Sequence, residues 1–449
     1  MNRLFGTDGV RGVANTELTP ELAFNLGKIG TYVLGKSKEK PLVLIGKDTR
    51  LSGDLLENAI TSGILSMGGN VINVGVLPTP AIAYLVSYMK ADAGVVISAS
   101  HNTYEFNGIK FFNSKGFKLD DDIEDEIEDI IVRDMDVNGH IEGDKLGRCI
   151  KAEDDAITLY GDFLKSTIDT DITGMKMVID CANGASYKVA EKVLKDLGAE
   201  VIVMGNEPDG VNINACCGST HPEALQKRVI EEQADIGLAF DGDADRLISV
   251  DEKGRIVDGD KMIYICAKML KDQGKLYDDK VTVTVMSNLG FHKAIEKIGA
   301  KADVTQVGDR YVLESMLKTG CVIGGEQSGH IIFLNHSTTG DGILSALQLL
   351  SALKRSGRKL SELADEVTIY PQVLKNARIK NENKRKYDKD PEIAAEIKRV
   401  EEIMAGEGRV LIRPSGTEPL VRVMLEGKDV EVITKLAEGL ATLLTKRMG

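Results

Sequence analysis

The chain of 449 residues is 43% hydrophobic and 28% charged, which is ordinary for a folded globular protein and excludes a disordered chain. Its length suggests about three domains, or four small ones. The net charge of −13 argues against a general nucleic-acid or membrane-surface binder, although a local cluster of Arg and Lys could still bind a small anion.

Targeting and redox features are sparse. The N-terminal segment has no apolar core of signal-peptide length, and no stretch approaches the apolar run of a membrane helix. The six cysteines are scattered and contain no Cys-x-x-Cys pair, which favours reduced thiols. These features predict a soluble cytoplasmic protein.

The first elements of the chain are a glycine-rich turn and a helix. The turn, residues 6–12, bears Arg11, and we pair it with Lys110. The helix-period run that starts at residue 22 continues into residues 30–37, which match the P-loop pattern letter for letter. A true P-loop follows a strand and opens a helix, whereas this segment ends a helix. We therefore interpret Gly35 as a helix cap.

One pattern occurs three times along the chain. An apolar strand, a helix-period segment, a turn with glycine and a second strand follow one another over residues 42–74, 177–204 and 281–306. Short strands around amphipathic helices predict β-α-β units with parallel pairing. Three such units predict three related α/β domains, with ligands at the carboxyl ends of strands.

A polar loop follows the apolar strand at residues 93–97 and carries Ser100. A loop serine alone is usually a turn or cap residue. A serine hydrolase is the other enzyme interpretation, but no Gly-x-Ser-x-Gly elbow surrounds Ser100, and residues 325–329 have the wrong spacing. Ser100 gains meaning next to a metal site, because a serine phosphate would supply a further hard oxygen ligand.

Such a metal site is predicted after the strand at residues 236–240. Asp241, Asp243 and Asp245 alternate, so on an extended backbone their carboxylates point the same way and repel unless a hard cation such as Mg²⁺ lies among them. A solvated acidic turn is the plainer interpretation, but the apolar strand directly before the segment argues against it. An EF-hand fails because Arg246 replaces the required glycine and strands flank the segment, with a hairpin turn at residues 251–254.

Two further loops carry polar groups suited to a sugar phosphate. Residues 324–330 present Glu326, Ser328 and His330 on flexible glycines, which suits hydrogen bonds to sugar hydroxyls or an amine. After residue 371 a charged segment precedes strands near residues 409–413 and 420–426 and a helix at 430–446, which predict a small α+β domain. A phosphate cradle is predicted there. Its residues are Arg413, Ser415, Gly416, Thr417 and Arg422.

All five motifs, in this order, resemble the α-D-phosphohexomutase superfamily over essentially the whole chain. The motifs are residues 5–12, 98–102, 241–246, 325–330 and 413–419. Gln327 favours the members that act on glucosamine phosphates over those that act on glucose or mannose phosphates. One departure is Thr103, where members of the family commonly have proline.

The resemblance implies four domains around a central cleft: residues 1–150 with the phosphoserine loop, 151–254 with the metal loop, 255–370 with the sugar loop and 371–449 as a phosphate-binding lid. It implies interconversion of glucosamine 6-phosphate and glucosamine 1-phosphate, on the route to UDP-N-acetylglucosamine, through phospho-Ser100 and a 1,6-bisphosphate. Mg²⁺ would bind Asp241, Asp243, Asp245 and the serine phosphate. The implied catalytic residues are Ser100, Lys110, Arg11, Arg246 and His330, and the implied substrate contacts are Glu326, Ser328 and the cradle.

Three alternatives stay open at this point. One is a mutase of the same superfamily that acts on glucose or mannose phosphates. Another is a phosphatase with Asp241 as nucleophile, and the third is a sugar-phosphate sensor on an inactive scaffold. Three further points stay open beside these alternatives: a homodimer, the first phosphorylation of Ser100, and the identity of the general base in each half-reaction.

Overall fold

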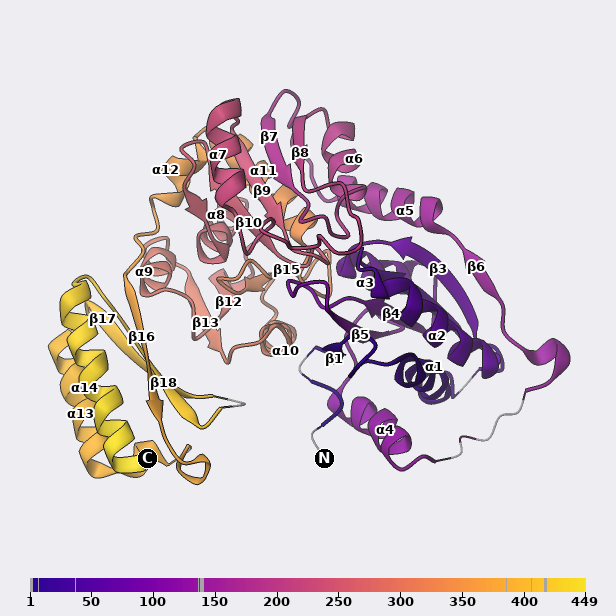
Figure 1. Cartoon of the computed structure of the whole chain (residues 1–449). Helices are drawn as coiled ribbons and strands as arrows, with labels where there is room; N and C mark the ends of the chain where they lie inside the picture. The colour runs from indigo at the N-terminus through magenta and orange to yellow at the C-terminus, as the bar shows by residue number, and fades with distance from the viewer. Residues whose placement is uncertain are drawn as a thin grey trace. The chain divides into compact units, whose positions relative to one another are not determined.

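A computed structural model describes the chain in two compact units. The described residues are 3–6, 8–36, 38–135, 137, 141–384, 386–404, 406–415 and 418–449. The first unit contains residues 1–286 and 300–365, and the second contains residues 287–299 and 366–449. Among the described residues, the first unit holds three sheets and the second holds one (Figure 1).

The first sheet is mixed. Its strand order is β1 (Val10–Val13), β5 (Phe106–Asn113), β4 (Ala93–Ile97), β2 (Leu42–Lys47), β3 (Asn70–Val76) and β6 (Cys149–Lys151). Strands β4, β2, β3 and β6 are parallel, and β5 runs antiparallel to both β4 and β1. Every residue of β4 is buried, as expected for a strand that is covered on both faces.

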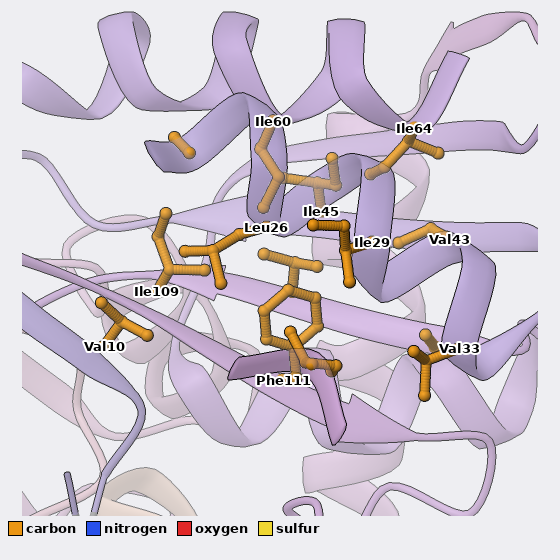
Figure 2. Packing of buried hydrophobic residues seen from close by; sticks show 14 of the residues in the cluster. Val10, Leu26, Ile29, Val33, Val43, Ile45, Ile60, Ile64, Ile109 and Phe111 are labelled. Atoms are coloured by element: carbon orange, nitrogen blue, oxygen red, sulfur yellow. The ribbon is translucent and has the colours of Figure 1, made fainter. Parts of the chain in front are cut away.

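Four helices accompany this sheet: α1 (Pro20–Leu34), α2 (Ser52–Ser66), α3 (Thr79–Tyr88) and α4 (Asp121–Val132). Helix α1 begins where the Thr19 side chain accepts a hydrogen bond from the Leu22 amide at 3.2 Å. Its apolar face joins α2 and the sheet in one core, and each fully buried side chain there contributes roughly 1.5–3 kcal/mol. Figure 2 shows this core with Leu26, Ile29, Ile45, Ile60 and Phe111.

The end of α1 confirms the rejection of a P-loop. The helix stops at Leu34, and the Gly35 amide donates to the Thr31 carbonyl at 2.9 Å. Gly35 is thus a helix cap, as the sequence predicts.

The second sheet has the order β11 (Ile256–Val257), β10 (Leu247–Asp251), β9 (Ile236–Phe240), β7 (Lys176–Asp180) and β8 (Glu200–Met204). Strand β7 is parallel to β8 and β9, while β9, β10 and β11 are antiparallel, which confirms the predicted hairpin turn. The helices here are α5 (Glu153–Ser166), α6 (Val189–Asp196) and α7 (Glu223–Glu232). Strand β9 is buried throughout and ends directly before Asp241.

The third sheet has the order β13 (Lys301–Thr305), β12 (Lys280–Thr284), β14 (Ile323–Gly325) and β15 (Ile331–Phe333). Strand β12 is parallel to β13 and β14, and β14 is antiparallel to β15. The α-helices are α8 (Gly259–Asp272), α10 (Asp309–Thr319), α11 (Gly342–Ser356) and α12 (Leu360–Ala364). Among the described residues, the 3₁₀ turns of the first unit are η1 (Gly143–Lys145) and η2 (Tyr277–Asp279).

The second unit is a small α+β structure. Its antiparallel sheet has the order β16 (Gln372–Arg378), β18 (Leu420–Gly427) and β17 (Gly408–Pro414). The helices are α9 (Leu289–Lys297), α13 (Pro391–Met404) and α14 (Val430–Met448), with 3₁₀ turns η3 (Asn381–Asn383) and η4 (Tyr387–Lys389). The predicted strands and last helix are confirmed. Helix α13 follows the charged segment and was not among the predicted elements.

The three predicted repeats are confirmed as strand–helix–strand units with parallel pairing: β2–α2–β3, β7–α6–β8 and β12–α9–β13. In the third repeat, helix α9 belongs to the second compact unit, whereas its strands β12 and β13 belong to the first compact unit. The predicted α/β class with mixed sheets and a C-terminal α+β part is confirmed, while the four domain boundaries stay predictions. In the described residues, no helix combines the length and apolarity that crossing a membrane requires.

Candidate active site

Ser100 lies in the loop after β4 and meets the loop after β9. Its hydroxyl donates to Oδ2 of Asp241 at 2.7 Å, across a sequence separation of 141 residues. The residue is only 2% exposed, and its φ of 53° places it in the left-handed region, which costs a non-glycine residue about 1–2 kcal/mol. Surrounding contacts therefore hold this serine against the aspartate.

The three aspartates converge, but not in the way that the sequence predicted. Asp241, Asp243 and Asp245 each offer a carboxylate oxygen, and these oxygens lie within 4.8 Å of one another. The prediction of an extended backbone is wrong: the segment is a turn in which the Ala244 amide donates to the Asp241 carbonyl at 3.0 Å. Ala244 has a φ of 56°. This turn, rather than strand alternation, brings the carboxylates together.

The electrostatics of this cluster are those of a site for a divalent cation. Burial raises the pKa of Asp241 well above its usual value, and the neighbouring Asp245 and Asp243 raise it further. Burial and the charge of Asp243 likewise raise the pKa of Asp245. Among the described residues, Oδ1 of Asp243 and Oδ1 of Asp245 are buried and accept no hydrogen bond. Unpaired hard oxygens of this kind fit Mg²⁺.

Lys110 supplies positive charge beside the carboxylates. Its ammonium lies 2.8 Å from Oδ2 of Asp243 and 3.0 Å from Oδ2 of Asp8, and its side chain is 2% exposed. Burial by itself raises the pKa of Asp243, but the Lys110 ammonium outweighs this effect and the pKa of Asp243 is lowered. Arg11 pairs with the same Asp8. The predicted pairing of the N-terminal turn with Lys110 thus runs through Asp8.

Arg246 and His330 come from neighbouring segments. Their backbones form an isolated antiparallel bridge, which joins the predicted metal loop (residues 241–246) to the predicted sugar loop (residues 324–330). The Arg246 side chain approaches Asp245 at 3.9 Å, and its backbone amide donates to Asp241 at 3.2 Å. His330 is buried, and its Nε2 accepts a hydrogen bond from the Gly340 amide at 3.2 Å. Within the described residues its Nδ1 is buried and has no hydrogen-bond partner.

These side chains line a cavity of about 490 Å³ in the first unit. The lining includes Arg11, Ser100, Asp245, Arg246, Glu326 and His330. Its volume and its mixture of cations, carboxylates and a hydroxyl suit a small polar anion.

Two adjacent side chains hold the middle of the predicted sugar loop, residues 324–330. The Glu326 carboxylate accepts a hydrogen bond from the Gly308 amide at 3.1 Å, and the Gln327 side-chain amide donates to Asp258 at 3.1 Å. Asp258 also caps α8, since its carboxylate accepts from the Lys261 amide at 3.1 Å. Ser328 is exposed and is not among the residues that line the cavity.

The predicted phosphate cradle lies in the second unit. Arg413 of β17 and Arg422 of β18 are register partners across the sheet. Ser415 follows β17, and its hydroxyl accepts from the Glu418 amide at 3.2 Å. Gly416 and Thr417 lie outside the described residues. The structure therefore groups Arg413, Ser415 and Arg422 with one another.

Several charged residues near the site were missed by the sequence analysis. Lys118 forms ion pairs with both Asp8 and Asp309. The pair with Asp309 joins the segment after β5 to the first residue of α10. Asp8 stood inside the glycine-rich turn that the sequence singled out, so it could have been found. Lys118 and Asp309 carry no local motif, because their proximity arises only from the tertiary fold.

His101 adjoins Ser100, with Nδ1 3.4 Å from the Ser100 hydroxyl. Burial lowers the pKa of His101 to about 4, helped by the positive charges of Arg246 and Arg11. Its ring is therefore neutral at physiological pH and adds no charge beside the serine.

Four family models match consecutive parts of the chain. They are described as Phosphoglucomutase/phosphomannomutase alpha/beta/alpha domain I (residues 2–137), domain II (159–254), domain III (258–370) and C-terminal domain (374–443).

Full-length relatives carry a more specific name. The chain is 58% identical to a phosphoglucosamine mutase of Clostridium novyi, over 100% of this chain and 99% of that protein. It is 57% identical to a phosphoglucosamine mutase of Alkaliphilus oremlandii, over 100% of both chains.

Solved structures show the same fold at low identity. A phosphoglucomutase/phosphomannomutase family protein from Burkholderia thailandensis matches with a TM-score of 0.82 and 22% identity, covering 99% of this chain and 98% of that one. An N-acetylphosphoglucosamine mutase from Aspergillus fumigatus, in complex with GlcNAc-6P and magnesium, matches with a TM-score of 0.66 and 18% identity, covering 99% and 96%.

Proposed function

Because the chain belongs to the phosphoglucosamine mutases of the α-D-phosphohexomutase superfamily, we propose that its site transfers phosphate between glucosamine phosphates through Ser100. The activity is the interconversion of glucosamine 6-phosphate and glucosamine 1-phosphate, and the enzyme is an isomerase. The observation that carries the role of Ser100 is its hydroxyl, hydrogen-bonded at 2.7 Å to Asp241 of the carboxylate cluster.

The proposed cycle uses phosphorylated Ser100 as donor. The bond between phosphorus and Ser100 Oγ breaks while phosphorus bonds to O1 of glucosamine 6-phosphate, which gives the 1,6-bisphosphate. In this step O1 gives up its proton to a general base, and the freed Oγ takes up a proton from a general acid. The intermediate then reorients, and the bond between phosphorus and O6 breaks while phosphorus bonds to Oγ, which loses its proton. O6 takes up a proton, and glucosamine 1-phosphate is released. The loose transition state of phosphoryl transfer depends on positioning and charge neutralisation.

Mg²⁺ would be held by Asp241, Asp243, Asp245 and an oxygen of the Ser100 phosphate. When bound, the ion neutralises charge on the transferred phosphoryl group. Lys110, Arg11 and Arg246 add positive charge near the same point, since all three pair with aspartates in or beside the cluster. From the resemblance we assign Lys110 as the leading general acid/base, and we assign His330 as a further catalytic residue because it lines the cavity.

The remaining contacts would orient the sugar and bind the other phosphate. Glu326 lines the cavity, and we propose that it binds the sugar together with Ser328. We propose that the turn with Arg413, Ser415, Gly416, Thr417 and Arg422 binds the phosphate that does not react, because arginine offers paired donors that match phosphate oxygens. A cytoplasmic location, a role in UDP-N-acetylglucosamine synthesis and a homodimer belong to the same proposal.

The test measures both turnover and phosphate on the protein. Wild-type enzyme incubated with glucosamine 1,6-bisphosphate and Mg²⁺ should gain the mass of one phosphate at Ser100, and Ser100→Ala should lose both this label and mutase turnover. The matched control is Ser62→Ala, since Ser62 lies exposed on α2. A Ser100→Ala enzyme that retains turnover would reject the role of Ser100.

Two additional measurements separate the alternatives. A label that hydroxylamine removes would indicate an aspartyl phosphate, as the phosphatase with Asp241 as nucleophile requires, whereas phosphoserine survives this treatment. Coupled assays with glucose and mannose phosphates should give a kcat/KM well below that for glucosamine phosphate. Equal values would instead indicate a mutase of broad preference.

A further inference from the structure

Arg50 lies beneath the serine loop without belonging to the cavity. It follows β2, is 3% exposed, and its Nε donates to Oδ2 of Asp48 at 2.8 Å. Its two terminal nitrogens donate to four carbonyls of the serine loop. These are the carbonyls of Ser100 (2.9 Å), Asn102 (2.9 Å), Thr103 and Phe106 (3.1 Å). A planar guanidinium is the only side chain with enough donors in a fixed geometry for such a set of acceptors.

The aspartate partner of Arg50 extends the same network to the amide of Ser100. Oδ2 of Asp48 accepts a hydrogen bond from the Ser98 hydroxyl at 2.6 Å, and Ser98 Oγ in turn accepts from the Ser100 amide at 3.0 Å. The network thus fixes both backbone groups of Ser100, whose φ is left-handed. Arg50 binds its carbonyl, and Ser98, held by Asp48, binds its amide. Asp48, Arg50, Ser98 and Ser100 are all buried.

A second donor reaches the loop from the segment after β8. The Asn214 side-chain amide donates to the Ser100 carbonyl at 2.9 Å and to the Asn102 carbonyl at 3.0 Å. The Ser100 carbonyl therefore accepts two strong hydrogen bonds, one from Arg50 and one from Asn214. Asn214 lies between β8 and α7, in the same part of the chain as the second sheet. This contact therefore ties the loop of Ser100 to the part of the chain that carries the aspartates.

We infer that Arg50 and Asn214 are positioning residues that hold Ser100 in its left-handed conformation with Oγ directed at the carboxylate cluster. Residues 98–106 contain no proline, so no covalent restriction fixes the backbone of this loop. Without these donors the loop carbonyls would lose buried partners, and Ser100 would relax toward an unstrained φ. Neither residue lines the cavity, so both act on catalysis through the loop and not through the substrate.

Two variants test the inference. Arg50→Lys keeps the positive charge but loses the planar set of guanidinium donors, and Asn214→Ala removes the second donor to the Ser100 carbonyl. Displacement of a reacting atom by about 1 Å costs on the order of 10²-fold in rate, so we expect kcat to fall by about that factor for Arg50→Lys and by about tenfold for Asn214→Ala. KM for glucosamine 1-phosphate should stay within about threefold, because substrate contacts are intact. The matched control is Arg255→Lys, since Arg255 pairs with buried Asp251 at 2.7 Å and binds the Ser361 carbonyl, away from the loop.

A chemical rescue distinguishes positioning from general stability. Arg50→Ala leaves a guanidinium-shaped space, and millimolar guanidinium chloride should raise kcat of this variant at least about tenfold without changing Arg255→Ala. If Arg50→Ala does not fold, Arg50→Lys and Asn214→Ala decide by their kcat and KM. Unchanged kcat in those two folded variants, or a loss that appears in KM alone, would overturn the inference.

The inference rests on the proposed role of Ser100, and the outcomes keep the two apart. Wild type and the positioning variants should all become phosphorylated at Ser100 when incubated with glucosamine 1,6-bisphosphate, but the variants more slowly. A turnover-competent Ser100→Ala would overturn the role of Ser100 itself. An inactive Ser100→Ala beside an Arg50→Lys enzyme that is phosphorylated at the wild-type rate would overturn the positioning role alone.

Discussion

The ammonium nitrogen of Lys110 lies 2.8 Å from Oδ2 of Asp243, and both side chains are buried. Asp243 also accepts a hydrogen bond from the Thr79 hydroxyl at 2.7 Å through the same oxygen. Only its other oxygen, Oδ1, stays unpaired within the described residues. Lys110 and a bound cation would therefore share one carboxylate, each through its own oxygen, and would repel each other across it.

This arrangement predicts opposite effects of Lys110→Met on metal binding and on catalysis. Removal of one positive charge a few ångströms from the carboxylates should tighten Mg²⁺ binding by at least about tenfold. Turnover should fall by on the order of 10²-fold or more, because the proposed mechanism assigns to Lys110 both a positive charge near the transferred phosphate and a proton transfer. Isothermal titration with Mg²⁺ and the coupled mutase assay measure the two effects.

The matched control is Lys47→Met, since Lys47 is also largely buried and ion-paired, to Asp54 and Glu57, in the first sheet. It should leave both Mg²⁺ affinity and turnover within about twofold of wild type, because exposed or distant charges couple weakly. Weaker Mg²⁺ binding by Lys110→Met would contradict the shared-carboxylate arrangement.

Metal binding should release protons. Burial and mutual repulsion raise the pKa of Asp241 and of Asp245, whereas a metal ligand must be ionised. Mg²⁺ affinity should therefore fall as the pH is lowered, since protons then compete for the same oxygens. Titrations in buffers of different ionisation enthalpy count the protons that are released. Asp245→Asn should release fewer, because Asp241 loses a repelling neighbour; an unchanged proton count would contradict the assignment.

The sequence predicted the parts of the fold that short-range patterns encode. Apolar strands and helical periodicity identified the three parallel units, and the Asp241–Asp245 spacing identified the cluster. The turn geometry at Ala244 was not predicted, because alternation of aspartates fits an extended strand equally well. Helix α13 was missed because its charged start, near Pro391, resembles a linker. Local periodicity cannot show which distant segments meet.

The contacts that support the site could not be predicted from the sequence either, because they join segments that are distant along the chain. Arg50 carries no motif of its own, and its role depends on four carbonyls that lie 50 to 56 residues further along the chain. Lys118 and Asp309 are 191 residues apart and meet only after folding. Sequence patterns indicate which groups can do chemistry, whereas the contacts that orient them are set by tertiary packing.

Gly242 offers a steric test of the contact between the serine loop and the metal loop. A Cβ at this position would lie 2.5 Å from the Ser100 carbonyl oxygen and 2.8 Å from the Asn214 side-chain nitrogen. Gly242→Ala should therefore push the two loops apart, lower turnover by on the order of 10²-fold and destabilise the protein by roughly 1–3 kcal/mol. Mutase assays and thermal unfolding measure these effects.

The control for this substitution is Gly439→Ala in α14, where an added Cβ meets no atom within 4 Å. It should stabilise the helix by up to about 1 kcal/mol and leave turnover unchanged. Wild-type turnover by Gly242→Ala would show that the serine and metal loops need not lie in close contact.

Asp341 makes the first unit lose stability as the pH rises. The carboxylate caps α11 by accepting from the Leu344 amide at 2.9 Å, and it accepts from the Tyr160 hydroxyl at 2.7 Å. Burial nevertheless raises the pKa of Asp341 to about 6, against 3.8 for the ordinary carboxyl. Between these two values the unfolded chain has lost its proton while the native protein keeps it, so the free energy of unfolding decreases with increasing pH. The full cost, about 3 kcal/mol, is present above pH 6.

Asp341→Asn should remove this dependence, because asparagine caps a helix equally well and does not ionise. Variant and wild type should have similar unfolding temperatures at pH 4, and the variant should become more stable by several degrees by pH 7. Tyr160→Phe should act in the opposite sense: the Tyr160 hydrogen bond lowers the pKa of Asp341, so its removal should extend the loss of stability to higher pH. Scanning calorimetry across pH 4 to 7 measures both, and parallel curves for wild type and Asp341→Asn would contradict the raised pKa.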